Sequence, residues 1–307
     1  KKVLKHRLNE FDVIHDNQSL CYELLFFQKK IPLVTTIHHP ISKDLKFQLK
    51  STKSIFLKFL MIRWHSFLRM QIKVAKKLNS VIVVSKSSKQ DIHDDFGLKK
   101  EAMKVILNGI DTEAFFPDEN IKKIPFRIVT SASADVPLKG LDYLLEAFSE
   151  VIKIFPDSTL QIIGSSKQGG HTSRKINDLN IKEKVQFNND LSFKEVRDLY
   201  CSADVVVIPS LYEGFGFAIG EAMACRVPVI TTSGGAIPEV IEDCGILVSP
   251  GNSKELEEAM IKLLPDEERK SFFAEKGFNR IIEHLKWEKV AKLMTESYET
   301  EINKITN

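Results

Sequence analysis

The sequence predicts an α/β protein with two doubly wound domains, each built around a parallel sheet. The 307 residues give room for two domains and a sizeable core. Short β-branched runs alternate with helical stretches, which is typical of parallel sheets covered by helices. A polar stretch that begins after Pro117 and ends at Pro125 divides these elements into two sets. We therefore expect domains over residues 1–118 and 124–285, followed by a last helix over 286–307.

The first set of elements contains three expected strands. They cover residues 12–15, 33–37 and 80–84, and the serines among residues 85–88 offer N-caps for the next helix. Asn108-Gly109 then marks a turn. At roughly 30 residues per βαβ unit, the elements before Asp12 are too few for a complete doubly wound domain, and the chain does not begin with methionine. We therefore expect an incomplete N-terminal domain in a truncated chain.

The second set contains six expected strands with helices between them. The strands cover residues 128–131, 160–163, 185–187, 205–208, 229–231 and 246–248. Helices are expected at 141–155, 193–200 and 217–225, among others. The last helix contains Trp287 and Tyr298. This second set predicts a doubly wound domain of its own.

Basic charge is concentrated towards the N-terminus. Residues 1–123 carry 23 Lys and Arg against 13 Asp and Glu, whereas residues 124–307 carry 21 against 28. The excess is concentrated in residues 43–77, where Asp44 is the only acid and apolar residues are interleaved with the basic ones. This pattern suits a basic amphipathic helix on an anionic membrane surface. It equally suits a core-packing helix with a solvated basic face. Nucleic acid is not expected as a partner, because no recognition module accompanies the charge.

The cysteines and histidines do not predict a metal centre. The four cysteines show no C-x-x-C spacing and no clustering with histidine, which favours a reducing compartment. No H-x-x-x-H or D-x-D spacing indicates a metal site. No signal peptide and no run long enough to cross a bilayer are visible. We expect a cytoplasmic protein without metal or cofactor, peripheral to the inner face of the membrane if residues 43–77 bind lipid.

The most informative motif covers residues 213–221. Glu213 and Glu221 stand eight residues apart, with Gly214 and Gly216 between them, shortly after the apolar run 205–208. The glycines let the backbone approach a ligand closely. Amides at the start of the following helix then face an anion, helped by the helix dipole. Glu221, one turn into the helix, can accept hydrogen bonds from sugar hydroxyls. Together these residues predict a nucleotide-sugar site.

This motif and the residues after it resemble the donor site of the family 4 retaining glycosyltransferases, which have the GT-B fold of two facing Rossmann-like domains. The matching residues are 213–221, the Ala-Met-Ala-Cys that follows, Val227-Pro-Val-Ile-Thr-Thr, Gly234-Gly235, Pro238-Glu239-Val240 and 245–251. The resemblance extends from about Asp12 to the C-terminus and is weakest over 43–77. It implies that the 1–118 domain binds the acceptor and the 124–285 domain binds the donor. It also implies that the last helix crosses back to the first domain.

The resemblance implies roles for single residues. Glu213 would contact and position the donor sugar, Lys139 would stabilise the departing diphosphate, and Glu221 would hold the ribose hydroxyls. Backbone amides near Gly216 would meet sugar and phosphate, and the backbone at Leu191 would meet the base. The full set of expected donor-binding residues is Ser131, Ser133, Leu191, Gly214, Phe215, Gly216, Phe217 and Glu221.

Two positions depart from the family pattern. Family members pair the lysine with an arginine five or six residues earlier, where this chain has Ala134 and Ser133. Asp135 adds a negative charge beside them. We expect Lys139 to act with the hydroxyls of Ser131 and Ser133, or Arg174 to reach in from a loop. Arg226 stands where the family usually has glycine, which is a departure at the local turn.

Histidines that follow the first strands are candidates for the other side of the reaction. His38 ends the strand 33–37, and the carboxyl ends of parallel strands line the crevice where α/β proteins bind ligands. The resemblance places His38 near the transferred sugar. His15 and His39 are candidates for the acceptor side.

The implied reaction is transfer of a sugar from a nucleotide-diphosphate donor, a co-substrate, to an unknown acceptor. Anomeric configuration would be retained without a protein nucleophile, and the donor phosphate would deprotonate the acceptor. Two alternatives stay open. One is a nucleotide-sugar epimerase with the same fold. The other is a non-catalytic sugar-nucleotide-binding protein, which the missing arginine and the absence of a glycine-rich loop in residues 1–40 favour.

Overall fold

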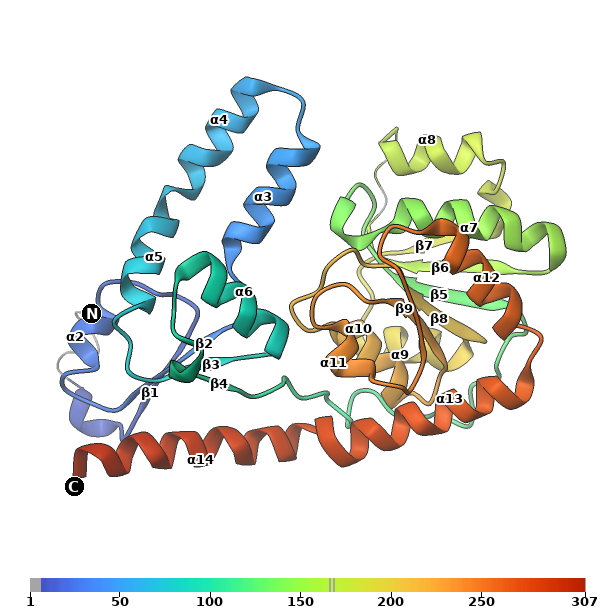
Figure 1. The fold of residues 1–307 in the computed structure, drawn as a ribbon. Coiled ribbons are helices and arrows are strands. Elements are labelled where there is room, and N and C mark those ends of the chain that lie inside the picture. Colours follow the sequence, from blue (N-terminus) through green and yellow to red (C-terminus); the bar gives the residue numbers. More distant parts are fainter. Residues whose placement is uncertain (1–6, 166, 168, 307) are drawn as a thin grey trace. The chain divides into compact units, whose positions relative to one another are not determined.

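The computed structural model describes residues 7–165, 167 and 169–306. The chain divides into two compact units, an N-terminal unit of residues 1–108 with 288–307 and a C-terminal unit of residues 109–287 (Figure 1). The sequence analysis predicted the boundaries between the two units at residues 118–124 and 285–286, whereas they lie after residues 108 and 287. The segment after Asn108 belongs to the C-terminal unit because the Ile110 amide donates to the Leu285 carbonyl at 2.7 Å. The predicted α/β class, with two parallel sheets, is confirmed.

The N-terminal unit contains a four-stranded parallel sheet in the order β1-β2-β3-β4. The strands are β1 (Ile14–Asn17), β2 (Leu33–Ile37), β3 (Val81–Val83) and β4 (Met103–Val105). β1 begins two residues later than predicted, because Ile14 pairs with Leu33 at the start of β2. Its shorter helices are η1 (Leu8–Glu10), α2 (Leu24–Phe27), α6 (Lys86–Phe96) and η3 (Lys100–Ala102). The first six residues, where the sequence indicated a helix end, lie outside the described residues.

Both faces of this sheet are covered. Val81 and Val83 contribute to a cluster on one face, whereas Ile82 between them packs on the other face with Val34. Helix α14 (Trp287–Thr306) lies on that second face through Val290. Burial on both sides explains why the strands read as continuous apolar runs rather than alternating ones.

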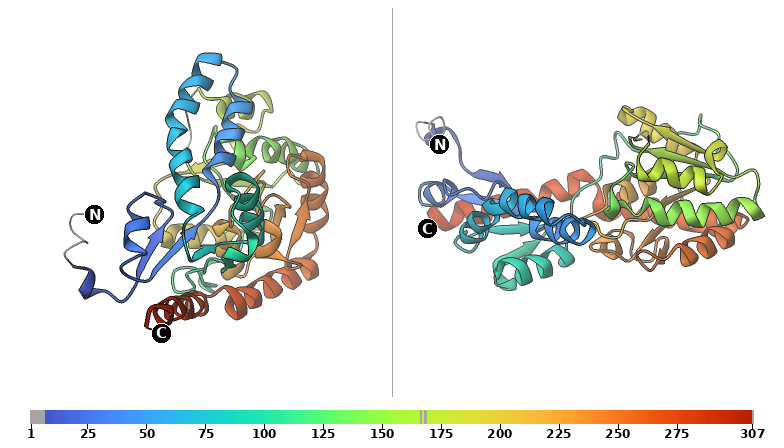
Figure 2. Two further views of the ribbon diagram at one scale, coloured as in Figure 1. Left: turned by 60° about the vertical axis from the view of Figure 1, so that its left-hand side comes forward. Right: turned by 90° about the horizontal axis from the view of Figure 1, so that it is seen from above.

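Residues 41–75 are not the single basic amphipathic helix that the sequence suggested. They form α3 (Ile41–Ser51), α4 (Ile55–Trp64), the 3-10 turn η2 (His65–Phe67) and α5 (Leu68–Ala75). The chain is extended at Thr52 and Ser54, and the Ser54 hydroxyl caps α4 by accepting from the Leu57 amide. Figure 2 shows α3 and α4 as two antiparallel arms. We call residues 41–75 the hairpin.

The C-terminal unit contains a six-stranded parallel sheet in the order β10-β9-β8-β5-β6-β7. The strands are β5 (Arg127–Ser131), β6 (Thr159–Ile163), β7 (Val185–Asn188), β8 (Val205–Ile208), β9 (Val229–Thr232) and β10 (Ile246–Val248). All six were predicted within one residue at either end. The order runs outward in both directions from neighbouring β5 and β8, which is the point where doubly wound sheets bind ligands.

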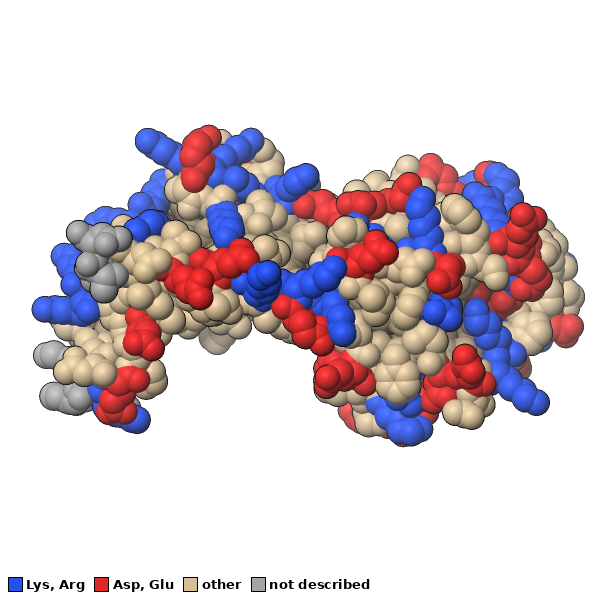
Figure 3. Space-filling view, turned by 90° about the horizontal axis from the view of Figure 1, so that it is seen from below, with Lys and Arg blue, Asp and Glu red and all other residues tan. Residues whose placement is uncertain are grey.

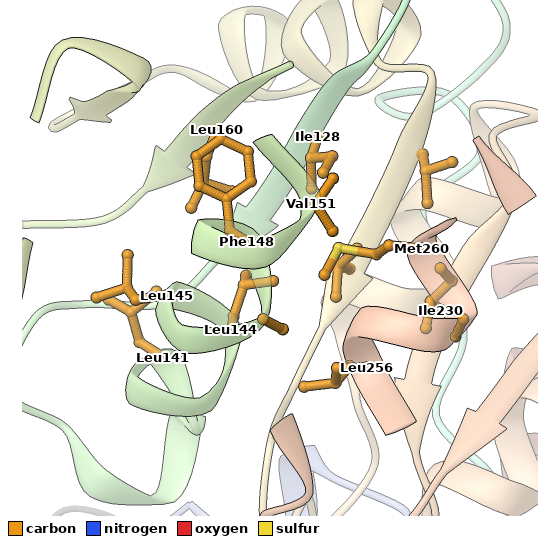
Figure 4. Packing of buried hydrophobic residues seen from close by; sticks show 14 of the residues in the cluster. Ile128, Leu141, Leu144, Leu145, Phe148, Val151, Leu160, Ile230, Leu256 and Met260 are labelled. Carbon is orange, nitrogen blue, oxygen red and sulfur yellow. The ribbon is translucent and has the colours of Figure 1, made fainter. Parts of the chain in front are cut away.

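Helices cover both faces of this sheet (Figure 1). They are η4 (Pro137–Lys139), α7 (Leu141–Ile154), α8 (His171–Asp178), η5 (Lys182–Lys184), α9 (Phe193–Ser202), α10 (Phe217–Ala224), α11 (Ile237–Ile241), α12 (Ser253–Leu263), α13 (Glu267–Arg280) and the π-helical turn η6 (Ile281–Leu285). Figure 4 shows Leu144 and Phe148 of α7 packed among strand residues and Met260 of α12. This fully buried core holds the loops at the carboxyl ends of the strands on a rigid base.

Candidate active site

Two loops at the reversal point of the C-terminal sheet carry the predicted motif residues. One follows β5 and ends in η4, and the other runs from Pro209 to Gly216 between β8 and α10. The two loops contact each other, because the Leu211 amide donates to the Leu138 carbonyl at 2.8 Å. The carboxyl ends of β5 and β8 therefore place residues from two distant parts of the sequence together.

Lys139 and Glu213 form an ion pair between these loops. Lys139 Nζ lies 2.8 Å from Glu213 Oε1, and the Ser210 hydroxyl donates to the same oxygen at 2.7 Å. Ser210 is buried, whereas Lys139 is part-exposed. Both contacts use Oε1, so Oε2 of Glu213 has no hydrogen-bond partner in the described part of the chain. The sequence predicted Lys139 and Glu213 but missed Ser210, whose only signal was its position two residues after the end of β8.

The loop that carries Glu213 is held by the Gly234-Gly235 turn. The Ala236 amide donates to the Glu213 carbonyl at 2.9 Å. Gly235 has φ +65°, and a Cβ there would lie 2.3 Å from the Glu213 carbonyl oxygen. Any larger residue would therefore push the Glu213 loop away, which explains the paired glycines downstream of the motif.

The start of α10 presents unused backbone amides. Gly216 is the N-cap residue and adopts φ +102°, with no side chain capping the helix. None of the amides of residues 215–218 donates to another group among the described residues. Phe215 is buried and Phe217 is half exposed. Their rings meet edge to face, with the ring centroids 5.0 Å apart. Free amides at a helix N-terminus are suited to bind an anion.

Glu221 lies one turn into α10 and is largely desolvated. Its side chain makes no hydrogen bond or ion pair among the residues that the structure describes. Burial raises the pKa of Glu221 to about 7. Tyr200 of α9, which is fully buried, has its pKa raised by burial and by the nearby Glu221 charge. A desolvated carboxyl group without partners is unfavourable in the unliganded protein and can be satisfied by ligand hydroxyls.

The remaining predicted donor-side residues lie in the same region without forming polar contacts to Lys139. Ser131 ends β5 and Ser133 follows it, and both side chains are half-buried. Leu191 is half-buried and immediately precedes Ser192, the N-cap of α9. In the described residues no hydrogen bond joins either serine to Lys139.

The positions that depart from the family pattern have structural partners. The Asp135 carboxylate accepts from the Thr172 amide at 2.9 Å, and that bond lowers the pKa of Asp135. The sequence suggested that Arg174 lies on a loop, but it lies on helix α8. Its guanidinium donates to the Gly169 carbonyl at 2.8 Å. Arg226 keeps the turn that its family glycine would make, with φ +55° and its guanidinium over the Phe278 ring.

The predicted histidines belong to the N-terminal unit. His38 follows β2, and its Nε2 lies 2.5 Å from the Asn17 side-chain oxygen, so Nε2 carries the proton and Nδ1 stays an acceptor. Burial, with smaller contributions from His39 and His15, lowers the pKa of His38, so its ring is neutral at neutral pH. The His39 carbonyl accepts from the Gln18 amide group at 2.9 Å.

His15 joins three elements of the N-terminal unit. Its Nε2 lies 2.8 Å from the Thr36 hydroxyl and its Nδ1 lies 2.9 Å from the Tyr298 hydroxyl. Both ring nitrogens of His15 therefore hold β1, β2 and α14 together, and burial lowers its pKa. These contacts give His15 a structural role beside the acceptor-side role that the sequence suggested.

The described residues contain neither a group of metal-ligating side chains nor a helix that could span a membrane. Among residues 7–165, 167 and 169–306, no three His, Cys, Asp or Glu side chains are grouped so that they could hold a metal ion. Within the same residues, no helix combines the length and apolar character needed to cross a bilayer. All four cysteines are free thiols.

Two family models match the chain. The model for glycosyl transferases group 1 matches residues 125–266, and the model for glycosyltransferase family 4 matches residues 1–114. Among curated proteins, the MMP alpha-(1->4)-mannosyltransferase of Mycolicibacterium hassiacum is 36% identical over 308 residues. That match covers 99% of this chain and 74% of the relative.

Solved structures of glycosyltransferases share the fold. Sucrose-phosphate synthase from Thermosynechococcus elongatus has a TM-score of 0.79 at 21% identity, covering 97% of this chain and 76% of that one. Anabaena HepE in complex with UDP-glucose has a TM-score of 0.79 at 22% identity, and the match covers 97% of this chain and 81% of HepE.

Proposed function

This chain belongs to glycosyltransferase family 4, and we propose that it transfers a sugar from a nucleotide-diphosphate donor to an acceptor with retention of anomeric configuration. Its relatives are glycosyltransferases of this family, so the chain is a glycosyltransferase. One observation carries the finer proposal, namely the desolvated Glu221 carboxyl without a partner in the described chain, beside four unused amides at the start of α10.

Glu221 and the amides suit two parts of the same donor. A ribose offers two neighbouring hydroxyl donors, which can satisfy both oxygens of the Glu221 carboxylate. A diphosphate offers the anionic oxygens that helix N-terminal amides bind. Both groups lie within the first turns of α10, so one nucleotide diphosphate can reach them together.

Lys139 and Glu213 are proposed to act on the sugar and the leaving group. Negative charge builds on the diphosphate as its bond to the anomeric carbon breaks, and a fixed cation stabilises that charge. Lys139 supplies the cation, and the amides of residues 215–218 supply neutral donors. The free Oε2 of Glu213 can accept a hydrogen bond from a sugar hydroxyl while Oε1 stays bound to Lys139 and Ser210.

The proposed step is balanced without a covalent enzyme intermediate. The acceptor oxygen bonds to the anomeric carbon as the bond from that carbon to the donor phosphate oxygen breaks. The acceptor proton passes to a phosphate oxygen of the departing nucleoside diphosphate. Attack from the face that the diphosphate leaves retains the configuration. Because Lys139 and the amides offset the phosphate charge, we propose that the reaction needs neither a metal nor a further cofactor.

Mannose is the sugar that the relatives favour. The Mycolicibacterium hassiacum relative is a mannosyltransferase at 36% identity. HepE was crystallised with UDP-glucose, which supports a nucleotide-sugar donor for the shared fold. We therefore propose a mannosyl donor, to be tested against glucosyl donors.

The free thiols support the further proposal that the chain works in a reducing, cytoplasmic compartment.

Ligand-induced stabilisation tests the donor site. The melting temperature is measured with GDP-mannose, UDP-mannose and UDP-glucose, since a ligand that binds only the folded state raises it. We expect one donor to raise it in the wild-type chain and to raise it much less in Glu221→Ala. The control is Glu258→Ala, an exposed glutamate on α12. No shift with any donor, or equal shifts in wild type and Glu221→Ala, would contradict the ribose role.

Product analysis tests transfer. We expect nucleoside diphosphate to be released with an acceptor extract present, with or without EDTA, and the new linkage to have the anomeric configuration of the donor sugar. A nucleotide-sugar epimerase would instead convert the donor without a transferred product. Release that depends on added metal would contradict the metal-independent step, and an inverted linkage would contradict retention.

A further inference from the structure

The hairpin of residues 41–75 has a well-anchored base and an uncovered middle. Leu68, Gln71 and Val74 of α5 are buried against the N-terminal unit. In contrast, α4 has no buried residue. The base is also tied to α6, because Lys43 pairs with Asp91 and Lys46 pairs with Asp95. The hairpin is therefore held in place while α4 remains open to its surroundings.

Helix α4 carries apolar side chains all round. Eight of its ten residues are apolar. Ile55 is 84% exposed, Trp64 is 79% exposed and Phe56 is 69% exposed. The other exposed apolar residues of α4 are Leu57, Phe59, Leu60 and Ile62. A helix that is hydrophobic all round is normally buried in a core or in a membrane, and a contiguous exposed apolar patch marks an interaction site.

Basic residues without acidic partners surround this helix. Within the described part of the chain, none of the following forms an ion pair: Lys50, Lys53, Lys58, Arg63 and Arg69. Asp44 is the only acid between residues 41 and 77. Elsewhere the charges are mixed, as on the face in Figure 3, where basic and acidic side chains lie close together. The surface around α4 therefore combines exposed apolar side chains with positive charges that no acidic side chain offsets.

We propose that α4 and its basic flanks bind an anionic lipid surface, with α4 lying in the interface between headgroups and acyl chains. Ten helical residues span about 15 Å, half of the roughly 30 Å hydrocarbon core, so α4 lies in the interface rather than across the membrane. Buried apolar area and attraction to anionic headgroups both strengthen such binding. Trp64 is suited to the headgroup level, where amphipathic aromatic rings collect.

A second copy of the chain fits this surface less well. A two-fold interface places the same patch on both partners, so the basic residues of one hairpin would meet those of the other. Like charges brought together across an interface oppose association. Negatively charged lipid supplies the opposite sign together with an apolar phase for α4.

Vesicle co-sedimentation tests the proposal without requiring transfer activity or a donor. We expect the chain to sediment with vesicles of phosphatidylglycerol and phosphatidylcholine, and to stay in solution with phosphatidylcholine alone. Replacing Lys50, Lys53 and Lys58 together by Gln should weaken partitioning on the order of a hundredfold, at about fivefold for each charge. Replacing Phe56, Phe59 and Trp64 by Ser should abolish it. Because all three are exposed, these substitutions leave the core intact.

The matched control changes exposed aromatic residues elsewhere. Phe193→Ser with Phe272→Ser alters two exposed rings of the C-terminal unit and should leave sedimentation unchanged. Trp64 emission gives a second readout, and in a Trp287→Phe background it should shift to shorter wavelength when anionic vesicles are added. Absence of vesicle binding, or equal binding by wild type and the α4 variants, would overturn the proposal. A dimer seen by light scattering and lost in the same variants would assign α4 to a second copy instead.

Discussion

Lys139 and Glu213 are 74 residues apart in the sequence and meet at 2.8 Å across the carboxyl ends of β5 and β8. The pair neutralises Glu213 while leaving the Lys139 ammonium part-exposed. We propose that the Glu213 carboxylate holds the Lys139 ammonium in place for the diphosphate of the donor. The family pattern would place an arginine at residue 133 or 134, where this chain has Ser133 and Ala134, so we propose that Lys139 is the cation that faces the diphosphate.

Removing the Lys139 charge should mainly slow the chemical step. Replacement of Lys139 by Met keeps much of the stem but removes the cation, and we expect kcat to fall about a hundred- to a thousandfold, the usual effect of losing one preorganised donor at a developing charge. Steady-state kinetics at saturating donor measure this. Lys153→Met, at an exposed ion pair on α7, is the control and should retain wild-type kcat. A loss confined to KM would place Lys139 in ground-state binding only.

Ser210 should act as a positioning residue for Glu213. Its hydroxyl and Lys139 share Oε1, so Ser210→Ala should leave the carboxylate held on one side only. We expect kcat to fall about ten- to a hundredfold, since hydrogen bonds to charged groups contribute about 1.5–3 kcal/mol. The measurement is a double-mutant cycle with Glu213→Gln. Independent, additive losses would show that Ser210 does not work through Glu213.

The strands and the motif could be predicted because their signals are local. Val205 to Ile208 is a continuous apolar run, and Glu213 to Glu221 is framed by glycines. The meeting of Lys139 with Glu213 could be expected only through the parallel topology, since no local pattern joins residues 74 positions apart. The only signal for Ser210 was its position after β8, and a serine there usually serves a turn, so its contact with Glu213 could not be predicted.

The hairpin shows why one prediction was wrong. Interleaved basic and apolar residues in 43–77 resemble one amphipathic helix, but Thr52 and Ser54 take extended conformations and break it. The Ser54 cap was readable from the sequence, whereas the lack of any buried residue in α4 depends on tertiary packing. Asp135 likewise looked harmful to phosphate binding, and only the structure shows its carboxylate bound to Thr172.

Donor binding should strengthen as the pH rises through about 7. Burial raises the pKa of Glu221 to about 7. Ribose hydroxyls donate hydrogen bonds to the ionised carboxylate, so donor binding favours loss of the Glu221 proton. Donor affinity measured by calorimetry should be weaker at pH 6 than at pH 8, by up to about tenfold per pH unit well below the pKa. Glu221→Gln should bind weakly and show a flat profile in this range. A wild-type profile that is equally flat would contradict a carboxylate at the ribose.

Of the three buried cysteines, Cys201 should react first with an alkylating reagent. The neighbouring Cys225 thiol is the largest cause that lowers the pKa of Cys201 to about 7, whereas burial raises the pKa of Cys244. Iodoacetamide labelling followed by peptide mass spectrometry should modify Cys201 before Cys244, with a rate midpoint near pH 7. Cys225→Ala should move that midpoint upward towards the ordinary thiol range. An unchanged midpoint in Cys225→Ala would rule out the Cys225 thiol as the cause.

Replacing Glu221 should stabilise the protein while weakening donor binding. The folded-state pKa of about 7 lies above the unfolded value of 4.5, so the folded state binds more protons between these values. The free energy of unfolding therefore falls as pH rises from about 4.5 to about 7 and is lowest above that range. Glu221→Gln removes the ionisation and should raise stability at pH 8 by up to about 3 kcal/mol, from 1.36 kcal/mol per pKa unit, with no gain at pH 4.

Urea unfolding at both pH values measures the difference. The control Glu258→Gln, on the exposed face of α12, should leave the free energy of unfolding unchanged at both pH values. A Glu221→Gln variant that is less stable at pH 8 would show that the carboxylate has a favourable partner in the unliganded protein. Glu221 would then not be held ready for a ligand.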